Sequence, residues 1–200
     1  SIYSVEPPSI DKSQQGSTKI YFKVVDPTKY TSLEAWQSEF FDIKPLDIAT
    51  LNDNDPYTGT GETKDKVIVK RNFANTKWQA LYLPVSLDCS ELVEDYDIAY
   101  INNVHQFDDN EDGVIDRTQL EAIRMKSGET LPNTPYLIKA KTTGDKEITL
   151  LLATLWAAAE PTFNVMSWYN EYVFHTTFKG VSGTDMVNNG YYALSEGSLV

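Results

Sequence analysis

The stretch Lys66-Val67-Ile68-Val69-Lys70-Arg71-Asn72-Phe73, followed after four residues by Trp78-Gln79-Ala80-Leu81-Tyr82-Leu83-Pro84-Val85, decides the fold class. Its first segment is centred on three consecutive β-branched residues. Its second segment alternates Trp78, Ala80 and Tyr82 with Gln79, Leu81 and Leu83. β-branched and aromatic residues with a period of two are typical of strands that pack into a sheet. The stretch therefore predicts two strands that are separated by turn residues.

The same pattern continues towards the C-terminus. Strand-like segments cover residues 96–107, 134–141, 146–158 and 171–179, and Asn189-Gly190 is a tight-turn signal before Tyr191. Residues 146–158 fit either two strands or one long strand. Short strands separated by turn residues at this spacing predict a mainly β protein, either an antiparallel β-sandwich or a barrel.

The N-terminal part of the chain contains the best helix candidate. Thr31 and Glu34 have the spacing of a capping box, and Leu33, Trp36 and Phe40 share one helical face, with Phe41 beside it. Pro45 is expected to end this helix. The sequence therefore predicts one short N-terminal α-helix in the otherwise β protein.

The remaining N-terminal segments differ from the strands that follow. Residues 1–16 form an arm without a hydrophobic period, and residues 19–25 are strand-like up to Asp26-Pro27. Residues 49–65 are rich in Asn, Asp, Gly and Thr, which is typical of a loop or linker. We therefore expect an N-terminal region at 1–65, holding the arm, the strand and the helix as a small subdomain or linker, and a β-sandwich-like domain at 66–200.

Composition excludes several classes of partner. The formal charge is −12 and the pI is about 4.5, which argues against nucleic acid and against an anionic membrane surface. No apolar run approaches the roughly 20 residues of a membrane span, so we expect no membrane insertion of this segment. The chain begins at Ser1, as expected either for a mature form after signal removal or for a fragment of a longer protein.

Residues 108–116, Asp-Asp-Asn-Glu-Asp-Gly-Val-Ile-Asp, carry the most specific chemistry in the chain. Counted as an EF-hand calcium loop, they offer oxygen ligands from the side chains of Asp108, Asn110, Asp112 and Asp116 and from the backbone of Val114, with Gly113 at the sharp turn. Position twelve is Gln119 instead of a bidentate Glu, so we expect weak, structural Ca²⁺ binding. The alternative is a plain acidic loop tip.

The residues around this loop do not read as EF-hand helices. Residues 98–107 suit a strand, and residues 120–126 suit either a return strand or a short helix. The loop is therefore expected to be a turn between two strands.

Part of the sequence resembles secreted and surface proteins of Bacteroides-type gut bacteria. The resemblance rests on Trp78-x-x-Leu81-x-x-Pro84 after an Asn-containing turn, on Pro135-Tyr136-Leu137-Ile138-Lys139-Ala140, and on Asn188-Asn189-Gly190-Tyr191-Tyr192-Ala193-Leu194. It covers about residues 66 to 200 and implies export, a β architecture and a surface or adhesive setting. These modules are largely uncharacterised, so no catalytic residues come with the resemblance.

No local signature of an active site stands out. His105 lies beside the acidic loop and His175 lies in an alternating strand, where a structural residue is expected more often than a base. Cys89, the single cysteine, has acidic neighbours and is expected to be a packed thiol. There is no zinc-type cluster and no Gly-x-Ser-x-Gly elbow, and no pair of acids singles itself out among many.

Exposed aromatic rings raise an alternative function. Trp168, Tyr169 and Tyr172 lie close together beside polar residues, as expected of a surface that stacks on sugar rings. Trp36, Trp78 and Trp156 have apolar, periodic settings and are expected in the core.

Three functions follow from these observations, in decreasing order of support. The first is a non-catalytic secreted or cell-surface β module for adhesion or protein assembly, with other surface proteins as partners. The second is a carbohydrate-binding module with glycans as partners. The third is a glycoside-acting enzyme that uses two carboxylates.

Overall fold

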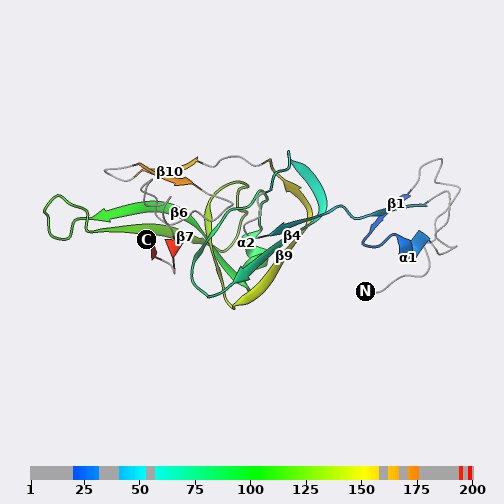
Figure 1. Ribbon diagram of the computed structural model, residues 1–200, viewed down its shortest axis with the longest axis horizontal. Coiled ribbons are helices and arrows are strands. Elements are labelled where there is room, and N and C mark those ends of the chain that lie inside the picture. Colours follow the sequence, from blue (N-terminus) through cyan, green and yellow to red (C-terminus); the bar gives the residue numbers. More distant parts are fainter. Residues whose placement is uncertain are drawn as a thin grey trace. The chain divides into compact units, whose positions relative to one another are not determined.

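The computed structural model describes residues 20–31, 41–52, 57–157, 162–166, 171–175, 194–195 and 198–199 (Figure 1). The chain divides into two compact units, residues 1–48 and residues 49–200. The boundary that we expected at residue 65 lies within a strand of the second unit.

The described residues of the first unit include two paired strands and a short helix. Strands β1 (Ile20–Val24) and β2 (Phe41–Pro45) pair in parallel, with Ile20 opposite Phe41. The four-residue helix α1 (Thr28–Thr31) follows Asp26, whose Oδ1 accepts a hydrogen bond from the Thr28 N–H at 3.1 Å. The strand expected before Asp26-Pro27 is confirmed.

The end predicted for the N-terminal helix was wrong. Residues Phe41–Pro45 form β2, because pairing with β1 supplies backbone hydrogen bonds that no local helical pattern reveals. The centre of that predicted helix, with Leu33 and Trp36, lies outside the described residues.

Two sheets make up most of the second unit. The first has the order β3 (Ile48–Asn52), β4 (Glu62–Phe73), β9 (Gly144–Leu155), and the second has the order β5 (Gln79–Leu81), β8 (Tyr136–Ala140), β6 (Tyr96–Phe107), β7 (Arg117–Met125). The pairs β4–β9, β5–β8, β6–β8 and β6–β7 are antiparallel. Among the described strands neither sheet closes on itself, so the fold is a sandwich-like arrangement and not a barrel.

One hydrophobic core is shared by the two sheets. From the first sheet it takes Leu51, Val67, Val69, Phe73, Ile148 and Leu155, and from the second Leu81, Tyr96, Ile98, Tyr136, Ile138 and Ala140. The connection between β5 and β6 closes the core with Val85, Leu87 and Cys89. This shared core makes the pair of sheets one folding unit.

The four-stranded sheet also buries side chains on its opposite face. Ala99, Ile101, Val104 and Leu137 form a second cluster, against which Trp78 and Leu120 pack. A bulge between Ile101 and Asn103 shifts the register of β6 there. Strand β10 (Thr162–Met166), paired antiparallel with β11 (Glu171–His175), lies beside β6.

Short elements complete the described chain. Helix α2 (Cys89–Leu92) is capped by Asp88, whose Oδ1 accepts a hydrogen bond from the Ser90 N–H at 2.8 Å. Strands β12 (Leu194–Ser195) and β13 (Ser198–Leu199) pair antiparallel. No helix in the described part of the chain is long and apolar enough to span a bilayer.

Two further expectations need correction. Residues 49–65, expected as a loop or linker, contain most of β3 and the start of β4, because pairing within the sheet outweighs their loop-like composition. Trp156, expected in the core, is 55% exposed, since it follows the last residue of β9. Of the two alternatives for residues 146–158, the structure shows one long strand, β9, which runs from Gly144 to Leu155.

Candidate functional site

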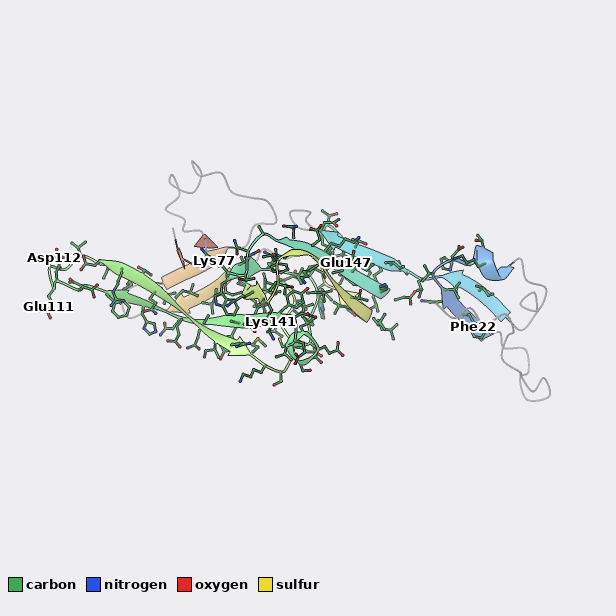
Figure 2. The ribbon with its side chains drawn as sticks, turned by 90° about the horizontal axis from the view of Figure 1, so that it is seen from below. Phe22, Lys77, Glu111, Asp112, Lys141 and Glu147 are labelled. Atoms are coloured by element: carbon green, nitrogen blue, oxygen red, sulfur yellow. The ribbon has the colours of Figure 1, made fainter. Side chains whose placement is uncertain are left out.

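The acidic loop connects β6 to β7, as the sequence predicts, and Figure 2 shows Glu111 and Asp112 at its end. Two hydrogen bonds close the base of the loop: the Asp116 N–H donates to the Phe107 carbonyl at 2.9 Å, and the Asp109 N–H donates to Asp116 Oδ2 at 2.8 Å. The Arg117 Nε lies 2.9 Å from Asp109 Oδ2. Its guanidinium lies 3.8 Å above the centre of the Phe107 ring, so cation and ring support the same turn.

Inside the loop, side-chain oxygens accept hydrogen bonds from backbone N–H groups. Asp108 accepts from the Asp112 and Gly113 N–H groups at 3.1 and 2.8 Å, and Asp112 accepts from Val114 at 2.8 Å. Gly113 has φ +86°, a conformation that glycine adopts without strain. The predicted ligand residues therefore fold into one compact turn of the Asx type.

The fit of this loop to a cation is partial. Carboxylate and amide oxygens are the donors that Ca²⁺ prefers, and Asp108, Asn110, Asp112 and Asp116 lie within one turn. Their oxygens contact loop N–H groups, however, and no three acidic, His or Cys side chains among the described residues are grouped so as to hold a metal. Gln119, the twelfth position of the EF-hand pattern, lies in β7 opposite His105, so it is part of the paired β6–β7 strands and not of the loop.

A second candidate site, which sequence reasoning missed, lies on β9. Ile148 and Leu150 pack against the core, and further along the strand Ala153 and Leu155 do so. The alternation between core-facing and solvent-facing residues shifts by one position between these pairs, because Leu152 has φ +51°. The pairing register with β4 is nevertheless the same before and after Leu152. Leu151 and Leu152 are consequently both exposed, at 75% and 77%.

The exposed leucines lie on a sheet edge. β9 pairs with β4, and no described strand pairs with its other side, so β9 is an edge strand of the described sheet. We call Leu151, Leu152 and the exposed Trp156 the β9 patch. The signal for it was present in the sequence, since the run Leu150-Leu151-Leu152 cannot alternate between core and solvent.

The β9 patch is unusual for its strained backbone. A non-glycine residue at φ near +50° is uncommon, and a bulky aliphatic one is an outlier. Glycine or asparagine would hold the same conformation at lower cost. Strain of this kind clusters at binding and switch sites.

No family model, curated protein or solved structure matches this chain.

His105 belongs to a hydrogen-bonded cluster, and Cys89 is buried. His105 Nε2 lies 2.6 Å from Glu121 Oε2, and Asn102 Nδ2 donates to Glu121 Oε1 at 2.5 Å, a cross-strand cluster on an exposed face. These hydrogen bonds, from His105 first and Asn102 second, lower the pKa of Glu121. Burial, followed by the charge of Asp88, raises the pKa of the Cys89 thiol, which suits a packed residue.

The residues expected to stack on sugars are described only in part. Trp168 and Tyr169 lie outside the described residues. Tyr172 lies in β11 opposite Val165, and His175, at the end of the same strand, lies opposite Thr162. The exposed indole in the described chain is Trp156.

Proposed function

We propose that this chain is a non-catalytic β module of a secreted or cell-surface protein, which assembles with other polypeptides through the β9 patch. The observation that carries the proposal is the pair of exposed leucines that a strained residue creates on β9, an edge strand among the strands that the structure describes. Exposed apolar surface of this kind marks protein–protein contacts, and an open edge accepts a further strand. The resemblance to surface modules of gut bacteria supports the secreted setting.

Photo-crosslinking tests this proposal. A benzoylphenylalanine placed at Leu152 in the protein on its native host is expected to form a discrete adduct with another polypeptide. The same residue placed at Asp145, exposed at the other end of β9, is the matched control and is expected to react weakly. Equal adducts at both positions, or none at Leu152, would contradict assembly through the β9 patch.

We also propose that the acidic loop takes up Ca²⁺ as a structural ion. The residues that would hold it are Asp108, Asn110, Asp112, Asp116 and the Val114 carbonyl. The ion would relieve the repulsion among five acidic residues within nine positions. Its role would be to stiffen the hairpin and not to act on a substrate.

Carbohydrate binding is the second candidate, favoured by the exposed Trp156. A flat exposed indole stacks on the face of a sugar ring, and the same ring serves a protein contact equally well. A glycan array with wild type and Trp156→Ala separates the two readings. Glycan binding that disappears in Trp156→Ala supports the sugar module, whereas adducts at Leu152 without glycan binding support assembly.

A further inference from the structure

A second exposed apolar group lies at the end of the β6–β7 hairpin. Val114 is 64% exposed and Ile115 is 41% exposed, and both lie in the loop whose end is marked by Glu111 and Asp112 in Figure 2. We call Val114 and Ile115 the hairpin tip. Adjacent exposed aliphatic residues at a loop end can insert into an apolar surface elsewhere.

The hairpin and the β9 patch differ in charge. Residues 96–125, which include β6, the loop and β7, carry seven acidic and two basic residues, a net charge of −5. The paired strands β4 and β9 carry four acidic and five basic residues, a net charge of +1. The whole chain has a net charge of −12, but the net charge of the sheet that bears the β9 patch does not repel the acidic hairpin.

Lysines lie next to the patch on the neighbouring strand. Lys66 is opposite Leu151 in the β4–β9 register, whereas Lys64, opposite Ala153, lies 2.9 Å from the Glu62 carboxylate. An incoming group with an apolar centre and acidic surroundings would place its aliphatic side chains on the leucines and a carboxylate near the Lys66 ammonium group. The hairpin tip has this composition, with Asp112 and Asp116 on either side of Val114 and Ile115.

We propose that the occupant of the β9 patch is the hairpin tip of a second copy of this chain. This inference rests on the proposed function and names its partner. Contact between two hairpin tips would oppose two charges of −5, and contact between two β9 patches would gain nothing from charge. A tip-to-patch contact uses two different surfaces of each copy, so it repeats head to tail and forms open chains unless the rotation closes a ring.

The contact is small and is therefore expected to be weak. Interfaces well below about 1,200 Å² are typical of transient association. We expect self-association of the 200-residue chain at concentrations on the order of 10⁻⁴ M or higher, which corresponds to about −5.5 kcal/mol.

Complementation between two variants tests the proposal. The tip variant Val114→Ser/Ile115→Ser and the patch variant Leu151→Ser/Leu152→Ser change exposed residues, and circular dichroism with a thermal melt checks that both fold. Sedimentation velocity over a concentration series is expected to show chains for wild type and monomers for each variant alone. An equimolar mixture is expected to form dimers and nothing longer, because one copy supplies the intact patch and the other the intact tip. Ile123→Ser, which removes a 40% exposed aliphatic residue from the hairpin stem, is the matched control and is expected to associate like wild type.

Other results overturn the inference in distinguishable ways. Association of the tip variant alone, with a monomeric patch variant, means that the patch binds something other than the tip and leaves the proposed function standing. A monomeric mixture excludes the tip-to-patch contact. Adducts at Leu152 that contain a different polypeptide also overturn the inference while supporting the proposed function.

Discussion

Leu152 shows how a single backbone conformation changes what a strand presents to solvent. Its φ of +51° turns two neighbouring leucines outwards without inserting a residue into the ladder. The sequence predicted the strand but not this turn, because alternation rules assume an extended conformation at every residue. Trp156 was also predicted from the alternation rule, which placed it in the core. The strand ends at Leu155, so the rule does not apply to Trp156.

Replacing Leu152 by glycine is expected to stabilise the protein. The left-handed conformation costs a residue with a Cβ roughly 1–2 kcal/mol. Glycine avoids this cost but loses more backbone entropy on folding, which offsets about 0.5–1 kcal/mol of the gain. Because the side chain is 77% exposed, little burial is lost. We expect Leu152→Gly to raise the free energy of unfolding by about 0.5–1 kcal/mol, measured by urea denaturation. Leu151→Gly, equally exposed, is the control and should lower stability; a similar loss in both variants would show that the strain is absent.

Thr130 is a buried polar residue in the described part of the chain, and its hydroxyl takes part in a buried hydrogen bond. Thr130 Oγ1 accepts a hydrogen bond from the Leu87 N–H at 2.9 Å, and the Thr130 N–H donates to the Leu87 carbonyl at 2.9 Å. Thr130→Val keeps the shape but leaves the buried Leu87 N–H without an acceptor, which costs about 1–3 kcal/mol. Thr130→Ser retains the hydroxyl and should lose less in the same denaturation experiment. If Thr130→Val were more stable than Thr130→Ser, this explanation would be contradicted.

At the scale of elements, strands with local signals were predictable and strands that depend on distant partners were not. Residues 96–107 were predicted as a strand and form β6 with the same bounds, because alternation and the acidic turn mark the segment locally. β2 and β3 lie in segments that resemble a helix end and a loop, and they form strands because β1 and β4 pair with them. The loop 108–116 was predictable as a turn between strands, whereas its internal hydrogen bonds were not.

Ca²⁺ is expected to stabilise the hairpin. If the dissociation constant lies in the range of roughly 10⁻⁴–10⁻³ M, 10 mM Ca²⁺ adds about 1.4–2.7 kcal/mol, and each kcal/mol raises the Tm by about 2–4 °C. Asp112→Ala removes an expected ligand and should abolish the shift. Asp109→Asn, which changes an acid outside the expected ligand positions, should preserve it. Identical melting curves of wild type in 10 mM Ca²⁺ and in chelator would remove the calcium hypothesis.

The Glu121 cluster predicts a dependence of stability on pH. Hydrogen bonds from His105 and Asn102 lower the pKa of Glu121 from its ordinary 4.5, so the unfolded chain binds the proton more readily than the folded chain. The resulting stabilisation is present above pH 4.5 and disappears as the pH falls through the lower pKa of the folded state. Urea denaturation from pH 3 to 7 should show a stability gap between wild type and Glu121→Gln that narrows below pH 4.5. A gap that is independent of pH would mean that the carboxylate charge contributes nothing.

At the scale of the whole molecule, composition and contacts divide the chain at different places. The loop-like composition of residues 49–65 suggested a boundary at 65, whereas contacts group residues 1–48 and 49–200. The reason is Leu51, which is 8% exposed in the core shared by the two sheets and draws β3 into the second unit.

The second unit is therefore expected to fold without the first. The buried residues of both described core clusters lie between Leu51 and Leu155, so a chain of residues 47–200 keeps them all, together with the whole of β3. We expect this chain to melt at the temperature of the corresponding transition in the full chain, measured by differential scanning calorimetry. A chain of residues 57–200 lacks β3 and loses the burial of Leu51, which alone is worth about 1.5–3 kcal/mol, so its transition should fall by several degrees. If the chain of residues 47–200 were destabilised as strongly as that of residues 57–200, the first unit would contribute to the same cooperative core, and the two units would have to be counted as one.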